Sequence, residues 1–331
     1  MAHNLATING AVAMAYQGET PWHELGTRME SGVVNVNDAL TAASLVWDVA
    51  LERMFLANGN SVPNRFAVVR TLDSTVLGTA SDWYKPIQYR DAFRVFQPAI
   101  EQFGLTVEAA GALGQGERAW MLFKLGADIE PVPGDHVAGY GVATSGHDGK
   151  TCFQFRPTPI RTICQNTLDA ANAFGGLKGR VFGVSHIGSD VDKQVTAATE
   201  LVTKAIAAMQ ETGETFAAMA RKQLTPEAVV RYIETVFPAA DNGDISKQLA
   251  TRRKTVSELV WTGVGAELAL SETGGEPNPW ACYNAVTEYF DHVATAASAK
   301  RTRAANTSAL FGTGADVKLF ALQAARQLVT A

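Results

Sequence analysis

Four histidines in this 331-residue chain occupy positions where an imidazole could bind a metal ion. They are His23, His147, His186 and His292. Imidazole and carboxylate groups are common ligands of zinc and manganese, and Glu24, Asp148 and Glu288 lie within a few residues of three of them. No pair has the spacing of an HExxH motif, so a metal-dependent enzyme is retained only as an alternative.

Other chemical signatures are missing from the sequence. The Gly-rich turns lack the pattern of a P-loop and the strand and helix context of a dinucleotide-binding fingerprint, and no GxSxG motif is present. Cys164 stands at the start of a predicted helix, where a thiolate is favoured, but no His and Asp partners can be assigned to it. We therefore expect no cofactor, and we favour a protein that is not an enzyme.

A local excess of basic residues is the second chemical feature. The chain is acidic overall, with a formal net charge of −5, yet residues 150–180 contain five cations and one carboxylate. The cations are Lys150, Arg156, Arg161, Lys178 and Arg180. A shorter cluster follows at Arg252, Arg253 and Lys254. Such clusters can neutralise a phosphate backbone even on an acidic protein.

Two aromatic residues alternate with polar ones beside these cations. Phe153 and Phe155 flank Gln154 on a predicted strand, so their rings share one face. Bases of a single strand stack on such rings, and arginines nearby hold the backbone. In the opposite interpretation the rings face the core and Arg156 lies at a solvated rim, which is the commoner arrangement for aromatic residues in strands.

Pattern and composition predict an α+β fold. The apolar fraction is 47%, enough for a sizeable core, and no apolar run approaches the length of a membrane span. Short connections between strands predict a mainly antiparallel sheet with helices on one face, over residues 1–189, followed by a helical region over residues 190–331. Strands are predicted at 65–70, 75–79, 105–110, 118–123, 137–144 and 151–156. Helices are predicted near 38–45 and at 89–103, 161–173, 190–222, 226–237, 245–268, 280–297 and 315–328.

Several runs resemble a phage- and plasmid-borne family of unknown function, DUF932. They are the segments 16–26 (YQGETPWHELG), 146–149 (GHDG), 159–168 (PIRTICQNTL) and 284–292 (NAVTEYFDH). The glycine directly before His147 replaces the serine that we expect in this family. The resemblance implies a protein of a bacterial mobile element, in the host cytoplasm, and a distant similarity to single-strand annealing recombinases, which assemble as rings.

Together these features predict a single-stranded DNA-binding protein that promotes annealing without ATP during phage or plasmid recombination. The expected partners are single-stranded DNA and further copies of the chain, in a ring or filament, and no membrane. A third possibility is a phage accessory factor that binds a host protein through its helical half.

Overall fold

A computed structural model describes residues 4–21, 24–126, 128–149, 151, 153–158, 182–183, 191–240, 242–293 and 313–330. The chain forms two compact units. One unit contains the described residues up to 126 and those of 139–207, and the other contains residues 128–138 and those from 208 onward. The boundary between these units falls inside the long helix α5 (Val191–Arg221).

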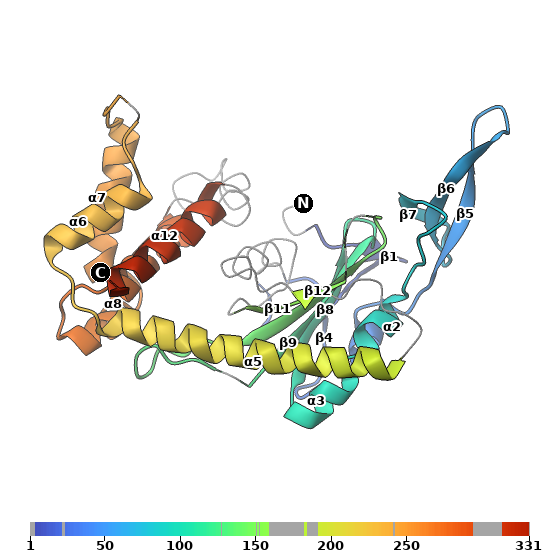
Figure 1. Ribbon diagram of the computed structural model, residues 1–331, viewed down its shortest axis with the longest axis horizontal. Coiled ribbons are helices and arrows are strands. Elements are labelled where there is room, and N and C mark those ends of the chain that lie inside the picture. The colour runs from blue at the N-terminus through green and yellow to red at the C-terminus, as the bar shows by residue number, and fades with distance from the viewer. Residues whose placement is uncertain are drawn as a thin grey trace. The chain divides into compact units, whose positions relative to one another are not determined.

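The first unit is built on β-sheets (Figure 1). Its main sheet has the order β12-β11-β10-β9-β8-β3-β4 among the described residues. The strands are β3 (Met14–Tyr16), β4 (Thr27–Arg28), β8 (Thr106–Leu113), β9 (Arg118–Lys124), β10 (Tyr140–Gly146), β11 (Gln154–Thr158) and β12 (Phe182–Gly183). Every pair is antiparallel except β3–β4, as the short connections predict.

Two smaller sheets complete this unit. They are a pair, β1 (Thr7–Ile8) with β2 (Ala11–Val12), and a three-stranded antiparallel sheet of β5 (Val49–Phe55), β6 (Ser61–Arg70) and β7 (Thr75–Ala80). The hairpin predicted at 65–70 and 75–79 is thus confirmed, within a longer β6.

The described part of this unit also contains three short helices, α1 (Val36–Ala42), α2 (Tyr89–Arg94) and α3 (Gln97–Phe103). Helix α1 packs against β3 and β8, and α2 packs against β10. Between α2 and α3 the Phe96 ring inserts beside Phe123, with ring centroids 5.2 Å apart. The single helix predicted over 89–103 is wrong in this detail: Pro98, which lacks a backbone N–H, stands in the first turn of a separate helix, where that donor is not needed.

Close packing in the main sheet depends on glycines opposite large rings. Gly111 pairs with Trp120 across β8 and β9, and a Cβ at Gly111 would lie 2.3 Å from the indole. Gly141 on β10 lies in the same way beneath Phe155. Both rings are fully buried, so the core extends across these strands.

The second unit is helical. Its helices are α6 (Pro226–Val236), α7 (Lys247–Thr262), α8 (Ala266–Leu270), α9 (Pro279–Glu288) with a π-helical continuation (Tyr289–Val293), and α12 (Thr313–Thr330), together with the 3₁₀ turn Ser271–Thr273. Thr225 caps α6 as the Thr-Pro pair predicts. The helix predicted over 245–268 ends instead at Gly263, whose extended backbone leaves the helix.

The remaining differences between the predicted and the observed elements are local. The helix predicted near 38–45 begins earlier, because Asn35 caps α1 by accepting a hydrogen bond from the Asn37 N–H at 2.8 Å. The helix predicted over 161–173 lies outside the described residues. Among the helices that are described, none has the length and apolarity that a bilayer crossing requires.

Candidate nucleic-acid interface

A two-stranded ribbon, here called the arm, extends from the three-stranded sheet (Figure 1). Strand β7 ends at Ala80, which pairs with Phe66, and Phe66 pairs on its other side with Arg53. Beyond this level β5 and β6 pair only with each other. The arm is therefore residues 53–66, and it lacks the third strand that normally stabilises a hairpin in water.

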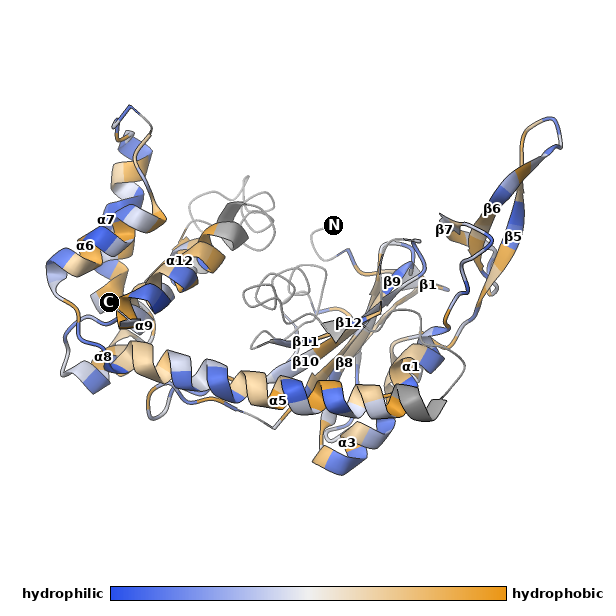
Figure 2. Ribbon diagram, viewed as in Figure 1, coloured by the Kyte–Doolittle hydropathy of each residue, from blue (hydrophilic) through white to orange (hydrophobic). Residues whose placement is uncertain are grey.

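The tip of the arm carries exposed apolar side chains. The turn is closed by hydrogen bonds from Leu56 N to Asn60 O at 2.8 Å and from Gly59 N to Leu56 O at 2.9 Å. Gly59 has a φ of +83°, a conformation that favours glycine. At the start of this turn Phe55 is 62% exposed and Leu56 is 55% exposed. Both hydrophobic and hydrophilic residues occur along the two strands of the arm (Figure 2).

Two arginines lie near the base of the arm, on opposite faces of the ribbon. Arg53 lies opposite Phe66, so Arg65, the neighbour of Phe66, points to the other face. Both arginines are exposed, and no carboxylate among the described residues forms an ion pair with either. Glu52 is the acidic residue next to the arm and is also exposed. The arm thus carries two exposed cations near its base and apolar side chains at its tip.

The edges of the arm discourage pairing with another strand. On β6, Pro63 has no N–H to donate, and Asn64 adopts a left-handed φ of +53°. On β5 the register shifts between Arg53 and Phe55, which marks an irregularity of the ladder. Natural edges are protected from strand addition by such features. Contacts made by the arm must therefore come from its side chains.

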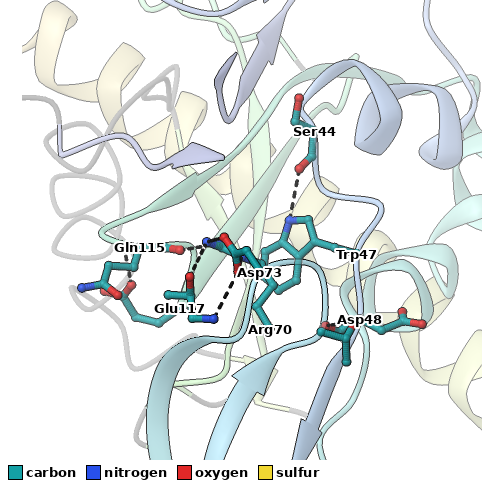
Figure 3. A network of polar contacts seen from close by, with 9 residues as sticks. Ser44, Trp47, Asp48, Arg70, Asp73, Gln115 and Glu117 are labelled. Carbon is teal, nitrogen blue, oxygen red and sulfur yellow. Dashed lines mark hydrogen bonds and ion pairs between the residues drawn. The ribbon is translucent and has the colours of Figure 1, made fainter. Parts of the chain in front are cut away.

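Arg70, at the end of β6 away from the arm, fixes the three-stranded sheet to the main sheet (Figure 3). Its guanidinium donates two hydrogen bonds to the Asp73 carboxylate, at 2.8 and 2.7 Å, and one to the Gln115 carbonyl at 2.5 Å. The same group lies 5.2 Å from the centroid of the Trp47 ring, whose Nε1 donates to Ser44 O. Hydrogen bonding from Arg70 holds the pKa of Asp73 below its ordinary value.

The Gly-His-Asp-Gly turn lies next to this anchor, and its histidine is buried. His147 is 1% exposed, and its ring lies 4.3 Å from the Tyr89 ring centroid. Neither imidazole nitrogen has a hydrogen-bond partner in the described part of the chain. Asp148 instead accepts from the Thr151 N–H and hydroxyl, at 2.6 and 2.8 Å. Burial lowers the pKa of His147 to about 4, an effect partly offset by Asp148.

The aromatic pair expected to stack on bases is buried. Phe155 is completely inaccessible and lies 5.0 Å from Phe96, and Phe153 is 8% exposed and lies 5.9 Å from the same ring. Both rings lie near Phe96, as the alternation predicts, but in the core, so they are not available to a ligand. Arg156 is half-buried and contacts the side chain of Gln154, and burial lowers its pKa.

The second predicted basic cluster is largely occupied by contacts within the protein. Arg253 donates two hydrogen bonds to the Phe237 carbonyl, at 2.9 and 2.7 Å. The guanidinium of Arg252 lies within 6 Å of three aromatic rings. They belong to Phe237, Tyr289 and Phe290, at 5.7, 5.8 and 5.9 Å. Lys254 is well exposed, with its ammonium 3.8 Å from Glu258.

Six predicted site residues lie outside the described residues. They are Lys150, Arg161, Lys178, Arg180, His23 and His186. His292 is placed only as part of the π-helical segment. Within the described ranges no group of three or more His, Cys, Asp or Glu side chains could hold a metal ion, and His147 is enclosed by aromatic rings.

Sequence reasoning missed the arm. Strand β5 carries the run Glu-Arg-Met-Phe at 52–55, which has no apolar face of its own, and its cations are isolated rather than clustered. The available signal was the Asn-Gly pair at 58–59 between two strand-like segments, a strong indication of a hairpin turn.

Comparisons with known proteins identify the family. A model described as a domain of unknown function, DUF932, matches residues 76–310, which is more than two thirds of the chain. The match begins within β7, so the arm precedes it, whereas the Gly-His-Asp-Gly turn lies inside it. No curated protein and no solved structure gives a significant match. The chain belongs to the DUF932 family.

Proposed function

We propose that this protein binds single-stranded DNA and promotes the annealing of complementary strands, without ATP, during phage or plasmid recombination. The observation that supports it most directly is the arm, where Phe55 and Leu56 are exposed at the tip and Arg53 and Arg65 are exposed near the base. Aromatic stacking combined with nearby cations is how proteins hold a single strand irrespective of its sequence.

The same features favour a nucleic acid over a protein partner. A protein that adds a strand to a sheet needs a regular open edge, and both edges of the arm are interrupted near its tip. Flat bases, in contrast, can stack on Phe55 without any backbone pairing. The two arginines on opposite faces suit a flexible backbone that passes around a narrow ribbon.

Two further parts of the proposal come from the resemblance noted in the sequence. One is a distant similarity to single-strand annealing recombinases, and the other is assembly into a ring or filament of identical chains. The protein would act in the cytoplasm of the bacterial host. Membership of DUF932 assigns no activity.

The test is the binding of a fluorescein-labelled oligothymidylate, followed by anisotropy at low salt. We expect Arg53→Glu/Arg65→Glu to lose most of the affinity, because the charge of both cations of the arm is reversed. The matched control is Arg221→Glu/Lys222→Glu, two exposed cations of the helical unit, which we expect to bind as the wild type does.

Three outcomes are decisive. Loss of DNA affinity in the arm variant alone supports the proposal. The rate at which this variant anneals complementary oligonucleotides should then fall together with its affinity. An equal loss of DNA affinity in both variants would show general electrostatic attraction. It would overturn the assignment of DNA binding to the arm. Absence of binding by the wild-type protein would overturn the function itself and favour a host-protein partner for the exposed tip.

A further inference from the structure

Trp83 is the most exposed of the tryptophans that the structure describes. It is 88% exposed, whereas Trp47, Trp120 and Trp280 are buried and Trp261 is 41% exposed. Tryptophan is the largest apolar side chain and is on average highly buried in proteins. A ring left almost entirely in water by a folded segment is available to contact a ligand.

The backbone on either side of Trp83 is held in place. On the N-terminal side, Ala80 is the last residue of β7 and is buried. On the C-terminal side, Tyr84 donates its N–H to Ser81 O at 3.1 Å, and its hydroxyl donates to Gly146 O at 3.3 Å. These contacts form a turn anchored at both ends. The exposure of the ring therefore results from the fold of this segment and not from a lack of local structure.

The register places this turn where the arm begins. Arg53, Phe66 and Ala80 are aligned across β5, β6 and β7, and Trp83 follows Ala80 by three residues. Lys85, two residues further, is exposed, as is the acidic Asp82. The flat indole is thus accompanied by one cation of its own, at the end of the arm opposite to Phe55.

We propose that Trp83 is a second stacking platform, which holds a base of the same single strand that contacts the arm. This inference rests on the proposed function and extends it, because it places the strand from the tip to the base of the arm. Stacking on an indole is tolerant of base identity, as binding without sequence preference requires. Lys85 would neutralise a neighbouring phosphate.

The experiment is a titration of unlabelled oligothymidylate into the intact chain, read by intrinsic tryptophan fluorescence and checked by anisotropy with labelled DNA. Stacking quenches indole emission, so we expect quenching in the wild type and in Trp261→Phe, the matched control, but not in Trp83→Phe. Trp83→Phe keeps an aromatic ring and should keep most of the affinity. Trp83→Ala should bind about tenfold more weakly, because one stacked base is lost.

The outcomes separate this inference from the proposed function. If the wild type binds DNA through the arm but Trp83→Phe is still quenched and Trp83→Ala binds normally, the second platform is refuted and the function stands. If no variant and no wild-type sample binds DNA, the function fails and the inference fails with it. If quenching is lost in Trp261→Phe and kept in Trp83→Phe, the DNA contacts the helical unit. That result would also refute the second stacking platform.

Discussion

His147 shows how a residue suited to chemistry serves the core instead. Its sequence context, between glycines and beside Asp148, is typical of a ligand or an acid–base group. In the fold its main-chain N–H donates to Glu117 O at 2.7 Å, and its ring fills the space between Tyr89 and Trp47. A buried imidazole without an acceptor is more stable when neutral, which is why its pKa is lowered.

This burial predicts a loss of stability in acid. Because the folded-state pKa of about 4 lies below the ordinary 6.5, the unfolded chain takes up the proton first, and stability is lost as the pH falls from 6.5 towards 4. We expect the free energy of unfolding to fall by roughly 2 kcal/mol more in the wild type than in His147→Gln, between about pH 7 and about pH 4.5. Urea denaturation at both pH values measures this, and parallel losses in the two proteins would contradict it.

Arg70 and Arg90 offer a comparison of a buried and an exposed ion pair. The Arg70 side chain is 4% exposed beside Asp73, whereas Arg90 and its partner Asp48 are 50% and 41% exposed. Arg70→Met removes the buried hydrogen bond to the Gln115 carbonyl and leaves that oxygen without its donor, so it should lower the free energy of unfolding by about 2 kcal/mol. Arg90→Met should change it by no more than about 0.5 kcal/mol. Chemical denaturation at neutral pH tests both, and equal effects would show that the anchor contributes nothing specific.

At the scale of elements, the arm can be separated from the sheet that carries it. Its distal residues make no third-strand contacts, and the core of the three-stranded sheet, Val68 and Val69, lies below it. Replacing residues 54–65 with an Asn-Gly turn should therefore change the free energy of unfolding by less than about 1 kcal/mol, because little apolar area is buried there. The same variant should lose single-strand binding. An unfolded product, or one that binds DNA normally, would refute this assignment.

The elements that the sequence predicted well are those with local signals. The apolar stripe of α5 and the Thr225-Pro226 start of α6 are confirmed because period and capping act within a few residues. Helix breaks at Pro98 and Gly263 were missed because apolar spacing continues across them. The burial of Phe155 depends on Gly141 and Phe96, which are distant in sequence, and no local pattern contains that information.

At the scale of the whole molecule, charge limits how the chain can hold DNA. Its net charge is −5, so nonspecific attraction is weak and only local cations can neutralise phosphates. Three exposed cations, Arg53, Arg65 and Lys85, belong to the arm and its base. The salt dependence of the DNA affinity therefore reports how many phosphates the protein neutralises. It distinguishes this small interface from a longer basic groove.

The expected slope follows from counterion release. For single strands the slope of log K against log salt concentration is about −0.7 for each neutralised phosphate, so three contacts predict a slope of about −2. Arg53→Glu/Arg65→Glu should reduce its magnitude to about 0.7, because only the contact of Lys85 remains. Anisotropy titrations across a salt series measure both values. A slope of about −4 or steeper in the wild type would mean that cations elsewhere, such as those predicted at 150–180, also contact the strand, and that the arm is one part of a larger interface.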